Sequence, residues 1–222
     1  MTLSFTEENY LKTIYKIYER SKDSVSTNAI AAHLHTSAAS VTDMLKKLAA
    51  KNLIAYERYK GSKLTDLGSS TATALIRRHR LWETFLVDKL DFSWEEVHDI
   101  AEELEHISSK KLIDRLDQFL GYPKYDPHGD PIPNSDGKFT IRSQTSLGQL
   151  TAGESGVLVG VSAHENSFLT YLNTLEISIG ASIEIVKKNT YDMSMNIRVD
   201  GADPISITEK VGNNLLAKKN VV

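Results

Sequence analysis

The chain has 222 residues, of which 41% are hydrophobic, and a formal net charge of −3. It contains no cysteine, which excludes disulfides and thiolate metal ligands. No apolar run approaches the roughly 20 residues that span a bilayer, and the first residues lack the basic and then apolar character of a signal peptide. We therefore expect a globular, cytoplasmic protein with no membrane partner.

The charge is unevenly distributed along the chain. Residues 1–75 hold ten Lys and Arg against seven Asp and Glu, whereas the rest holds 16 against 22. The N-terminal part is mildly basic, so the negative net charge does not exclude nucleic acid as a partner.

Three helices are predicted at the N-terminus. Apolar and aromatic side chains recur at helical spacing over residues 6–20, with Thr6 as the expected N-cap. Thr27 is placed to cap a second helix over residues 28–34. After a tight break, a third helix is expected over residues 38–51.

A short hairpin follows these helices. Residues 53–65 alternate in character on either side of Gly61, the pattern of two strands and a turn. Helix, helix, turn, helix and hairpin is the order of a winged helix-turn-helix, whose third helix enters the major groove of DNA.

The middle of the chain predicts more helix. A long helix is expected over residues 69–89, Ser93 is placed to cap the next one, and a further helix covers residues 108–120. Three prolines then keep the chain extended up to residue 133, and residues 134–148 resemble a polar linker.

Short apolar runs with glycine punctuation begin near residue 150. They predict a small β-barrel interrupted by one helix over residues 167–175. The fold class is thus mainly α with small β parts. The expected domains are a DNA-binding domain at 1–73, a helical domain at 74–142, and a linker with a β domain at 143–222.

The predicted reading helix begins with small side chains that permit close approach to bases, and lysines and an arginine suited to phosphates surround it. A solvated basic face on a helical protein is the simpler alternative. The candidate DNA-binding residues are Ser37, Ala39, Ser40, Thr42, Asp43, Lys46, Lys47, Arg58, Lys60 and Lys63.

Potential metal ligands gather in the helical domain. On one helix, His98, Glu102, Glu105 and His106 fall within an arc of about 100°. A solvated acidic helix with two incidental histidines would also give this pattern. His79 and Glu83, one helical turn apart, and the Asp-Pro-His-Gly segment with Asp126 and His128 add donors and indicate more than one metal ion.

The sequence resembles the diphtheria-toxin-repressor-like metalloregulators, which include manganese-responsive repressors. The resemblance covers essentially the whole chain and rests on four segments: Glu8–Tyr15, Arg78–Glu83, Val97–His106 and Asp126–Pro133. It implies a homodimer that binds a palindromic operator in double-stranded DNA. It also implies a winged helix-turn-helix, a helical dimerisation and metal-binding domain, and a C-terminal SH3-like domain.

The resemblance assigns roles to individual positions. It implies a primary, regulatory site and an ancillary site, to which the SH3-like domain adds a ligand. Glu102, Glu105 and His106 match the primary site, which Asp126 and His128 join in a subset of members; His79, Glu83 and His98 match the ancillary site, with His164, or next Glu165, as the added ligand.

One departure from the family pattern concerns the first helix. Where the family usually has Asp or Met as a primary ligand, this chain has Asn9, whose neutral amide should bind a cation more weakly. Glu8 is an alternative ligand. One turn on, the position of a further manganese ligand holds Lys12.

The donor types bear on which metal is bound. Carboxylates, an amide and imidazoles favour Mn²⁺ or Fe²⁺ over thiolate-seeking ions. We expect a Mn²⁺-activated repressor of metal-homeostasis genes with two ions per subunit, the alternative being an Fe²⁺-responsive repressor. We expect no enzymatic activity, although a dinuclear metallohydrolase and a DNA-binding protein with structural Zn²⁺ sites are the rival interpretations.

Overall fold

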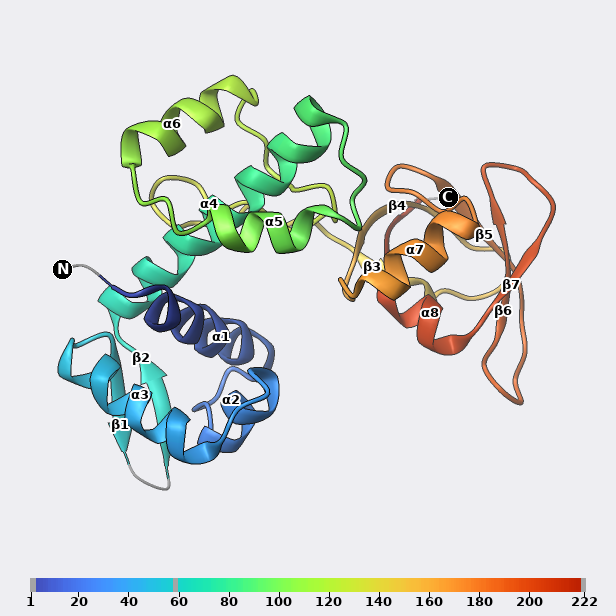
Figure 1. The fold of residues 1–222 in the computed structure, drawn as a ribbon. Helices are drawn as coiled ribbons and strands as arrows, with labels where there is room; N and C mark the ends of the chain where they lie inside the picture. Colours follow the sequence, from blue (N-terminus) through green and yellow to red (C-terminus); the bar gives the residue numbers. More distant parts are fainter. Residues whose placement is uncertain (1–2, 58–59, 221–222) are drawn as a thin grey trace. The chain divides into compact units, whose positions relative to one another are not determined.

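The computed structural model describes residues 3–57 and 60–220. It divides into two compact units: residues 1–79, 102–113 and 133–139 form the first, and residues 80–101, 114–132 and 140–222 the second. The long helix α4 (Asp66–Leu90) belongs to both units (Figure 1). No helix among the described residues is long and apolar enough to cross a membrane.

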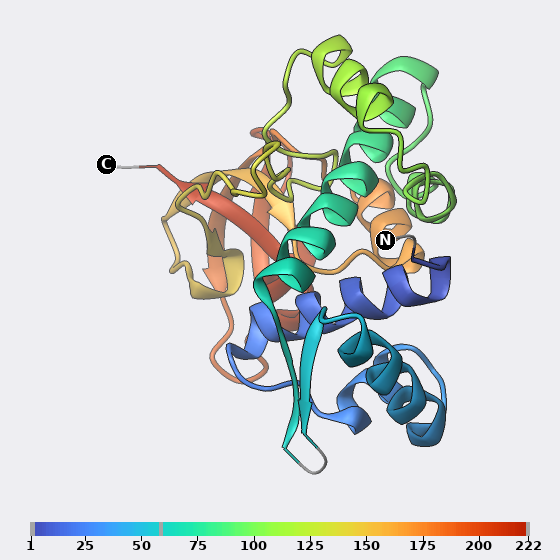
Figure 2. The ribbon, with the colours of Figure 1, turned by 90° about the vertical axis from the view of Figure 1, so that its left-hand side faces the viewer.

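The N-terminal domain has the predicted order of elements. Helices α1 (Phe5–Ser21), α2 (Thr27–His33) and α3 (Ala38–Ala50) precede the antiparallel hairpin of β1 (Ile54–Glu57) and β2 (Gly61–Leu64). Figure 2 shows the hairpin standing beside α3. Their common core comprises Tyr10, Leu11, Ile14, Tyr15, Val25, Ile30, Val41, Leu45, Leu48, Leu53, Ile54, Ala72 and Ile76.

Two predicted helix caps are wrong by one or two residues. Ser4, not Thr6, caps α1: its hydroxyl accepts from the Glu7 amide while the Glu7 carboxylate accepts from the Ser4 amide, a capping box. Ser26, not Thr27, caps α2. Neighbouring hydroxyl residues compete for a cap, and only Ser4 has a Glu three positions later.

The helices that follow also differ from expectation in length. α4 begins at Asp66 rather than Ser69, and α5 (Val97–Leu104) begins four residues after Ser93, whose amide and hydroxyl instead donate to Glu96. α5 ends at Leu104, so Glu105 and His106 lie in the turn beyond it. α6 (Lys110–Phe119) is close to its predicted range.

The C-terminal region is a six-stranded antiparallel sheet in the order β3-β8-β4-β5-β6-β7. The small β-barrel predicted from the sequence corresponds to this sheet, whose edge strands β3 and β7 do not pair among the described residues. The strands are β3 (Thr145–Ser146), β4 (Ser155–Val161), β5 (Ser182–Lys188), β6 (Met195–Val199), β7 (Ile205–Ile207) and β8 (Leu215–Lys219), with a 3-10 turn at Leu147–Gln149.

Two helices complete the core of this sheet. Helix α7 (Asn166–Thr174), predicted at residues 167–175, contributes Leu169 and Leu172, and α8 (Glu209–Asn214) contributes Val211. Together with the buried strand residues they form one hydrophobic cluster. The fold class, mainly α with small β parts, is confirmed.

The Asp126–Pro131 loop is held against β4 in the second unit. Gly129 has φ +86, and a Cβ at this position would collide with the Val159 carbonyl oxygen. The Val161 amide donates to the His128 carbonyl, and Arg142 donates to the carbonyls of Gly129 and Val159. The loop's donors therefore have a fixed position relative to the sheet.

Candidate metal centres and DNA-reading helix

The predicted reading helix presents small polar side chains to solvent at its N-terminal end. The Ser37 hydroxyl caps α3 by accepting from the Ser40 amide, and both residues are exposed. Thr42 is half-buried, and its hydroxyl donates to the Ala38 carbonyl. The other exposed candidates are Ala39, Asp43, Lys46, Lys47, Lys60 and Lys63, whereas Arg58 lies outside the described residues.

A groove of about 690 Å³ lies at this face. Its lining combines the start of α2 with Thr42 and Lys46 of α3 and with the hairpin, through Tyr56 and Gly61. Lys46 and Lys60 each pair with a nearby acidic residue, Asp43 at 3.2 Å and Glu57 at 2.7 Å. Such exposed pairs are weak and leave the ammonium groups accessible to phosphates.

In the first unit, four polar residues form what we term the Lys12 cluster: Lys12, His79, Glu102 and Glu105. The Lys12 ammonium lies 2.5 Å from Glu102 Oε1 and 2.6 and 2.8 Å from the two oxygens of Glu105. His79 Nδ1 lies 2.7 Å from Glu105 Oε2. The Glu105 side chain is fully buried, and that of Lys12 is 5% exposed.

His106 and Asn9 have other surroundings than the sequence implied. His106 Nδ1 lies 2.6 Å from Glu8 Oε2, and its ring stacks on Phe5. Arg78 donates to the other Glu8 oxygen at 2.9 Å. The amide oxygen of Asn9 is buried and has no hydrogen-bond partner among the described residues. Glu8 therefore contacts a predicted ligand, whereas Asn9 makes no such contact.

The second unit contains the Glu83 cluster: Glu83, Asp126 and His128, all buried. Each of the three offers a ligand atom, and these atoms lie within 4.8 Å of one another. Asp126 Oδ1 accepts from the amides of His128 and Asp130, which fixes its carboxylate. The three donors converge although 43 residues separate Glu83 from Asp126.

The hydrogen bonding of His128 fixes its tautomer. Nε2 lies 2.8 Å from the Trp94 carbonyl oxygen, which can only accept, so Nε2 carries a proton. Nδ1 is the atom that faces Glu83, at 3.8 Å from Oε1. A histidine that donates one ring N–H to a backbone carbonyl and turns the other nitrogen to neighbouring carboxylates has the arrangement of many metal ligands.

The electrostatics of the Glu83 cluster favour a cation. Burial raises the pKa of Asp126 to about 7, and the charges of Glu83 and Asp130 add to this against the opposing charges of Arg80 and His128. Burial lowers the pKa of His128, but the hydrogen bond and charge of Glu83 outweigh it and raise that pKa to about 9. Buried carboxylates whose negative charge is compensated by a protonated histidine can be compensated by a metal ion instead.

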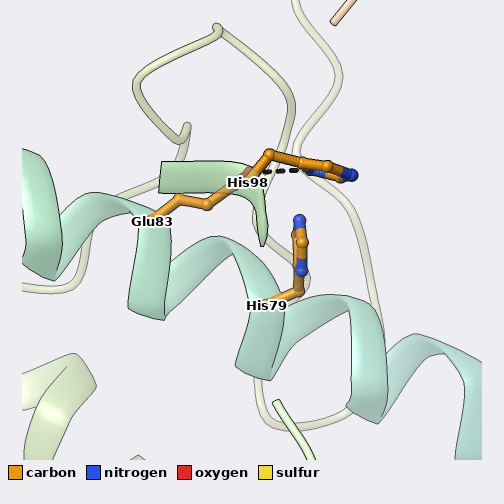
Figure 3. A group of neighbouring side chains, drawn as sticks. All are labelled: His79, Glu83 and His98. Atoms are coloured by element: carbon orange, nitrogen blue, oxygen red, sulfur yellow. Dashed lines mark hydrogen bonds and ion pairs between the residues drawn. The ribbon is translucent and has the colours of Figure 1, made fainter. Parts of the chain in front are cut away.

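Three further histidines, His79, His98 and His164, lie beside residues of the Glu83 cluster. Figure 3 shows Glu83 and His79 one turn apart on α4, with His98 of α5 beside Glu83 at 3.4 Å from Nδ1 to Oε1. The ligand atoms of these three residues also lie within 4.8 Å of one another. His164 lies near His128, with ring centroids 5.2 Å apart.

The grouping of donors differs from the expected one. The family resemblance groups Asp126 and His128 with Glu102, Glu105 and His106, whereas in the structure they lie with Glu83. Of the expected primary ligands, only Glu102 and Glu105 share a cluster, because His106 lies against Glu8 just beyond the end of α5. The expected ancillary residues His79, Glu83 and His98 do come together.

Sequence reasoning missed three contributors. Lys12 was noted as a departure but not as the partner of Glu102 and Glu105, and the carbonyl of Trp94 carries no sequence signal at all. Arg80 donates to Asp130 at 2.7 Å and lies 3.4 Å from Asp126. The signal for Lys12 was available, since a lysine between the core residues Leu11 and Ile14 needs a buried counter-charge.

Three family models match successive parts of the chain. Residues 2–62 match the N-terminal DNA-binding domain of iron-dependent repressors, and residues 65–134 match their metal-binding and dimerisation domain. Residues 145–218 match the FeoA domain.

Curated relatives match parts of the chain. Iron-dependent repressor IdeR of Mycobacterium tuberculosis is 35% identical over 58% of this chain and 55% of its own length. A probable metal transport system membrane protein of Chlamydia trachomatis is 46% identical over 39% of this chain. The chain spans 55% of the first relative's length and 19% of the second's.

Solved structures match nearly the whole chain. A manganese-dependent transcriptional repressor in complex with manganese is 33% identical, with a TM-score of 0.85 and coverage of 96% of this chain and 100% of its own. The manganese regulator SloR is 32% identical with a TM-score of 0.75, covering 99% of this chain and 100% of its own. These relatives are repressors rather than enzymes, and the chain belongs to the family of metal-dependent transcriptional repressors.

Proposed function

We propose that this protein is a metal-activated transcriptional repressor of metal-homeostasis genes. The observation that carries the proposal is the presence, in one chain, of an exposed winged-helix reading face and a buried group of carboxylate and imidazole donors. The first can bind DNA, and the second can bind a divalent cation. Manganese- and iron-dependent repressors are similar to this chain over both parts.

The regulatory ion is proposed to bind in the Glu83 cluster. Glu83 and Asp126 would supply carboxylate oxygens and His128 its Nδ1 atom, with His98 and His164 at the edge of the site. The ion would replace the proton that His128 carries at neutral pH, because a ligand nitrogen must be unprotonated. Metal binding should therefore weaken as the pH falls.

Mn²⁺ is the proposed physiological ion, with Fe²⁺ as the alternative. The donors are oxygen and imidazole nitrogen, which suit both ions. Zn²⁺, Co²⁺ and Ni²⁺ should bind the isolated protein at least as tightly, since affinity at such a site generally rises toward the later metals. The physiological ion is thus a matter of which ion activates DNA binding under cellular conditions.

The DNA target is proposed to be a palindromic operator bound by a homodimer in the cytoplasm. Two reading helices would enter successive major grooves about 34 Å apart. Exposed Lys46, Lys47, Lys60 and Lys63 would contact phosphates, and the side chains from Ser37 to Asp43 would contact base edges. A metal ion activates such a dimer only if it binds the DNA-competent arrangement more tightly than the arrangement that does not bind DNA.

The test is DNA binding by the full chain to the region upstream of its own gene. Binding is measured with Mn²⁺, with Fe²⁺ under argon, and with a chelator, and we expect tight binding only where the activating ion is present. Equal binding in all three conditions would contradict metal activation. Loss of structure in chelator, without reversible metal exchange, would favour a structural zinc site instead.

A further inference from the structure

We propose that Lys12 is a built-in cation that takes the place of a metal ion between Glu102 and Glu105. The family resemblance implies that these two carboxylates belong to the regulatory site, yet in the structure the Lys12 ammonium lies between them. A metal ion does not fit at that position while Lys12 holds it. This inference goes beyond the proposed function and concerns a different set of residues.

The Lys12 ammonium occupies the position between the two carboxylates that a bridging ion would take. This ammonium has three N–H donors, and three carboxylate oxygens lie 2.5, 2.6 and 2.8 Å from the nitrogen. Glu105 Oε2 also lies 2.7 Å from His79 Nδ1, so Lys12 and His79 share this oxygen. An ion bridging Glu102 and Glu105 would have to displace the ammonium.

Burial makes that displacement unfavourable. Lys12 is 4% exposed and Glu105 0% exposed, so both charges depend on each other for compensation. A divalent ion would bring two positive charges next to the ammonium, which the low-dielectric surroundings would not screen. Moving Lys12 away would leave its charge without a buried partner.

The first helix offers no other ligand charge at this site. Glu8 pairs with Arg78 and His106, and the neutral Asn9 oxygen is buried without a hydrogen-bond partner among the described residues. Lys12 comes from α1, whereas Glu102 and Glu105 come from the end of α5 and the turn beyond it. Lys12 thus joins these segments with a fixed charge, where a metal-bound site would join them only when the ion is present.

The test compares Mn²⁺ bound per chain in the full-length wild type, Lys12→Gln and Glu102→Gln proteins, by equilibrium dialysis at saturating Mn²⁺. Lys12→Gln frees two carboxylates beside His79, and we expect it to bind one more ion than the wild type. Glu102→Gln in the wild-type background should leave the number of ions unchanged. Lys51→Gln is the matched control, because it breaks the Lys51–Glu7 pair and frees only one carboxylate.

Each outcome decides the proposal. No additional ion in a folded Lys12→Gln protein overturns it, as does the loss of one ion in Glu102→Gln. If Lys12→Gln does not fold, the Glu102→Gln result alone carries the decision. Failure of the proposed function would look different, because Glu83→Gln would then leave the wild-type ion count unchanged while the increment from Lys12→Gln could still be observed.

Discussion

The Lys12 cluster and the Glu83 cluster contain the same types of side chain but differ in the cation that compensates their carboxylates. Each brings two buried or half-buried carboxylates and at least one histidine together, one in each compact unit. In the first, a lysine supplies the compensating charge. In the second, the protonated His128 and Arg80 lie near the carboxylates, and burial raises the pKa of Asp126 to about 7.

This difference separates a cluster whose charges are always compensated within the chain from one that can respond to metal ions in solution. A lysine that makes three short contacts is a permanent partner, so the carboxylates around it are satisfied whatever the solution contains. Burial disfavours the charged form of a carboxylate with a raised pKa, so a divalent ion that compensates this charge stabilises it most. Two clusters with similar composition can therefore have different roles, and their cations decide which role each has.

The largest effect is expected from Lys12→Met in chelator. Removing one partner of a buried ion pair typically costs about 3–5 kcal/mol of unfolding free energy. Mn²⁺ should restore part of this loss by binding to the freed carboxylates. Urea unfolding of the full chain, with and without Mn²⁺, measures both effects.

An exposed pair at the C-terminal end of the same helix, between Glu19 and the C-cap residue Lys22, provides the control for Lys12→Met. Lys22 lies 2.8 Å from Glu19 with 62% of its side chain exposed, so Lys22→Met should cost less than about 1 kcal/mol. Equal destabilisation by the two substitutions, or no recovery of Lys12→Met by Mn²⁺, would contradict the proposed role of Lys12.

Glu83→Gln addresses the other cluster. It removes a ligand charge at nearly constant shape, and we expect Mn²⁺ affinity to fall by more than about 100-fold, since even outer-shell changes cost 10–100-fold. DNA binding should then no longer respond to Mn²⁺. Asp99→Asn is the control, because Asp99 is exposed on α5 beside His98. An unchanged Mn²⁺ response in Glu83→Gln would remove this cluster from the mechanism.

Gly129→Ala tests whether the loop must lie against β4. A Cβ at Gly129 collides with the Val159 carbonyl, so the loop that carries Asp126 and His128 should shift. Mn²⁺ affinity should then fall by about 10-fold, the lower end of the range for changes to residues that hold metal ligands in place. Gly121 also has positive φ, +76, but open space around it. Gly121→Ala should therefore share the backbone strain without the loss of affinity, as metal titrations of both variants would reveal.

The smallest effect is expected at Glu7, which anchors α1 independently of Lys12. The hydrogen bond from Lys51 and that from the Ser4 amide hold its pKa below the ordinary value of 4.5. The folded state thus binds a proton less readily than the unfolded chain, and the stabilisation is present above pH 4.5 and lost as the pH falls through the lowered pKa. The stability difference between wild type and Glu7→Gln should be largest near neutral pH and vanish in acid. A constant difference from pH 7 to pH 3 would contradict this.

Local patterns in the sequence predicted most of the fold. The apolar spacing along α1 and α3 and the glycine-centred hairpin gave the winged helix-turn-helix, because each depends on residues close in sequence. The caps were harder to place, because Ser4 and Thr6 compete for one helix and Ser26 and Thr27 for another, and only Ser4 has a Glu three residues later. The end of α5 at Leu104 was missed, and this moved Glu105 and His106 off the predicted helical face.

The candidate site was predicted in its residues but not in its grouping. Glu83 meets Asp126 and His128 across more than 40 residues, and Lys12 meets Glu102 and Glu105 across about 90. Such pairings depend on how helices pack, which helical periodicity does not report. Spacing could show that His98, Glu102 and Glu105 are potential metal ligands. It could not show which of them already have a positively charged side chain as a partner.

Anomalous scattering from crystals of the full chain grown with Mn²⁺ tests the central claim most directly. We expect a manganese peak beside Glu83, Asp126 and His128 and none between Glu102 and Glu105, where the Lys12 side chain should remain. A peak between Glu102 and Glu105 with Lys12 displaced, and no peak at the Glu83 cluster, would contradict it.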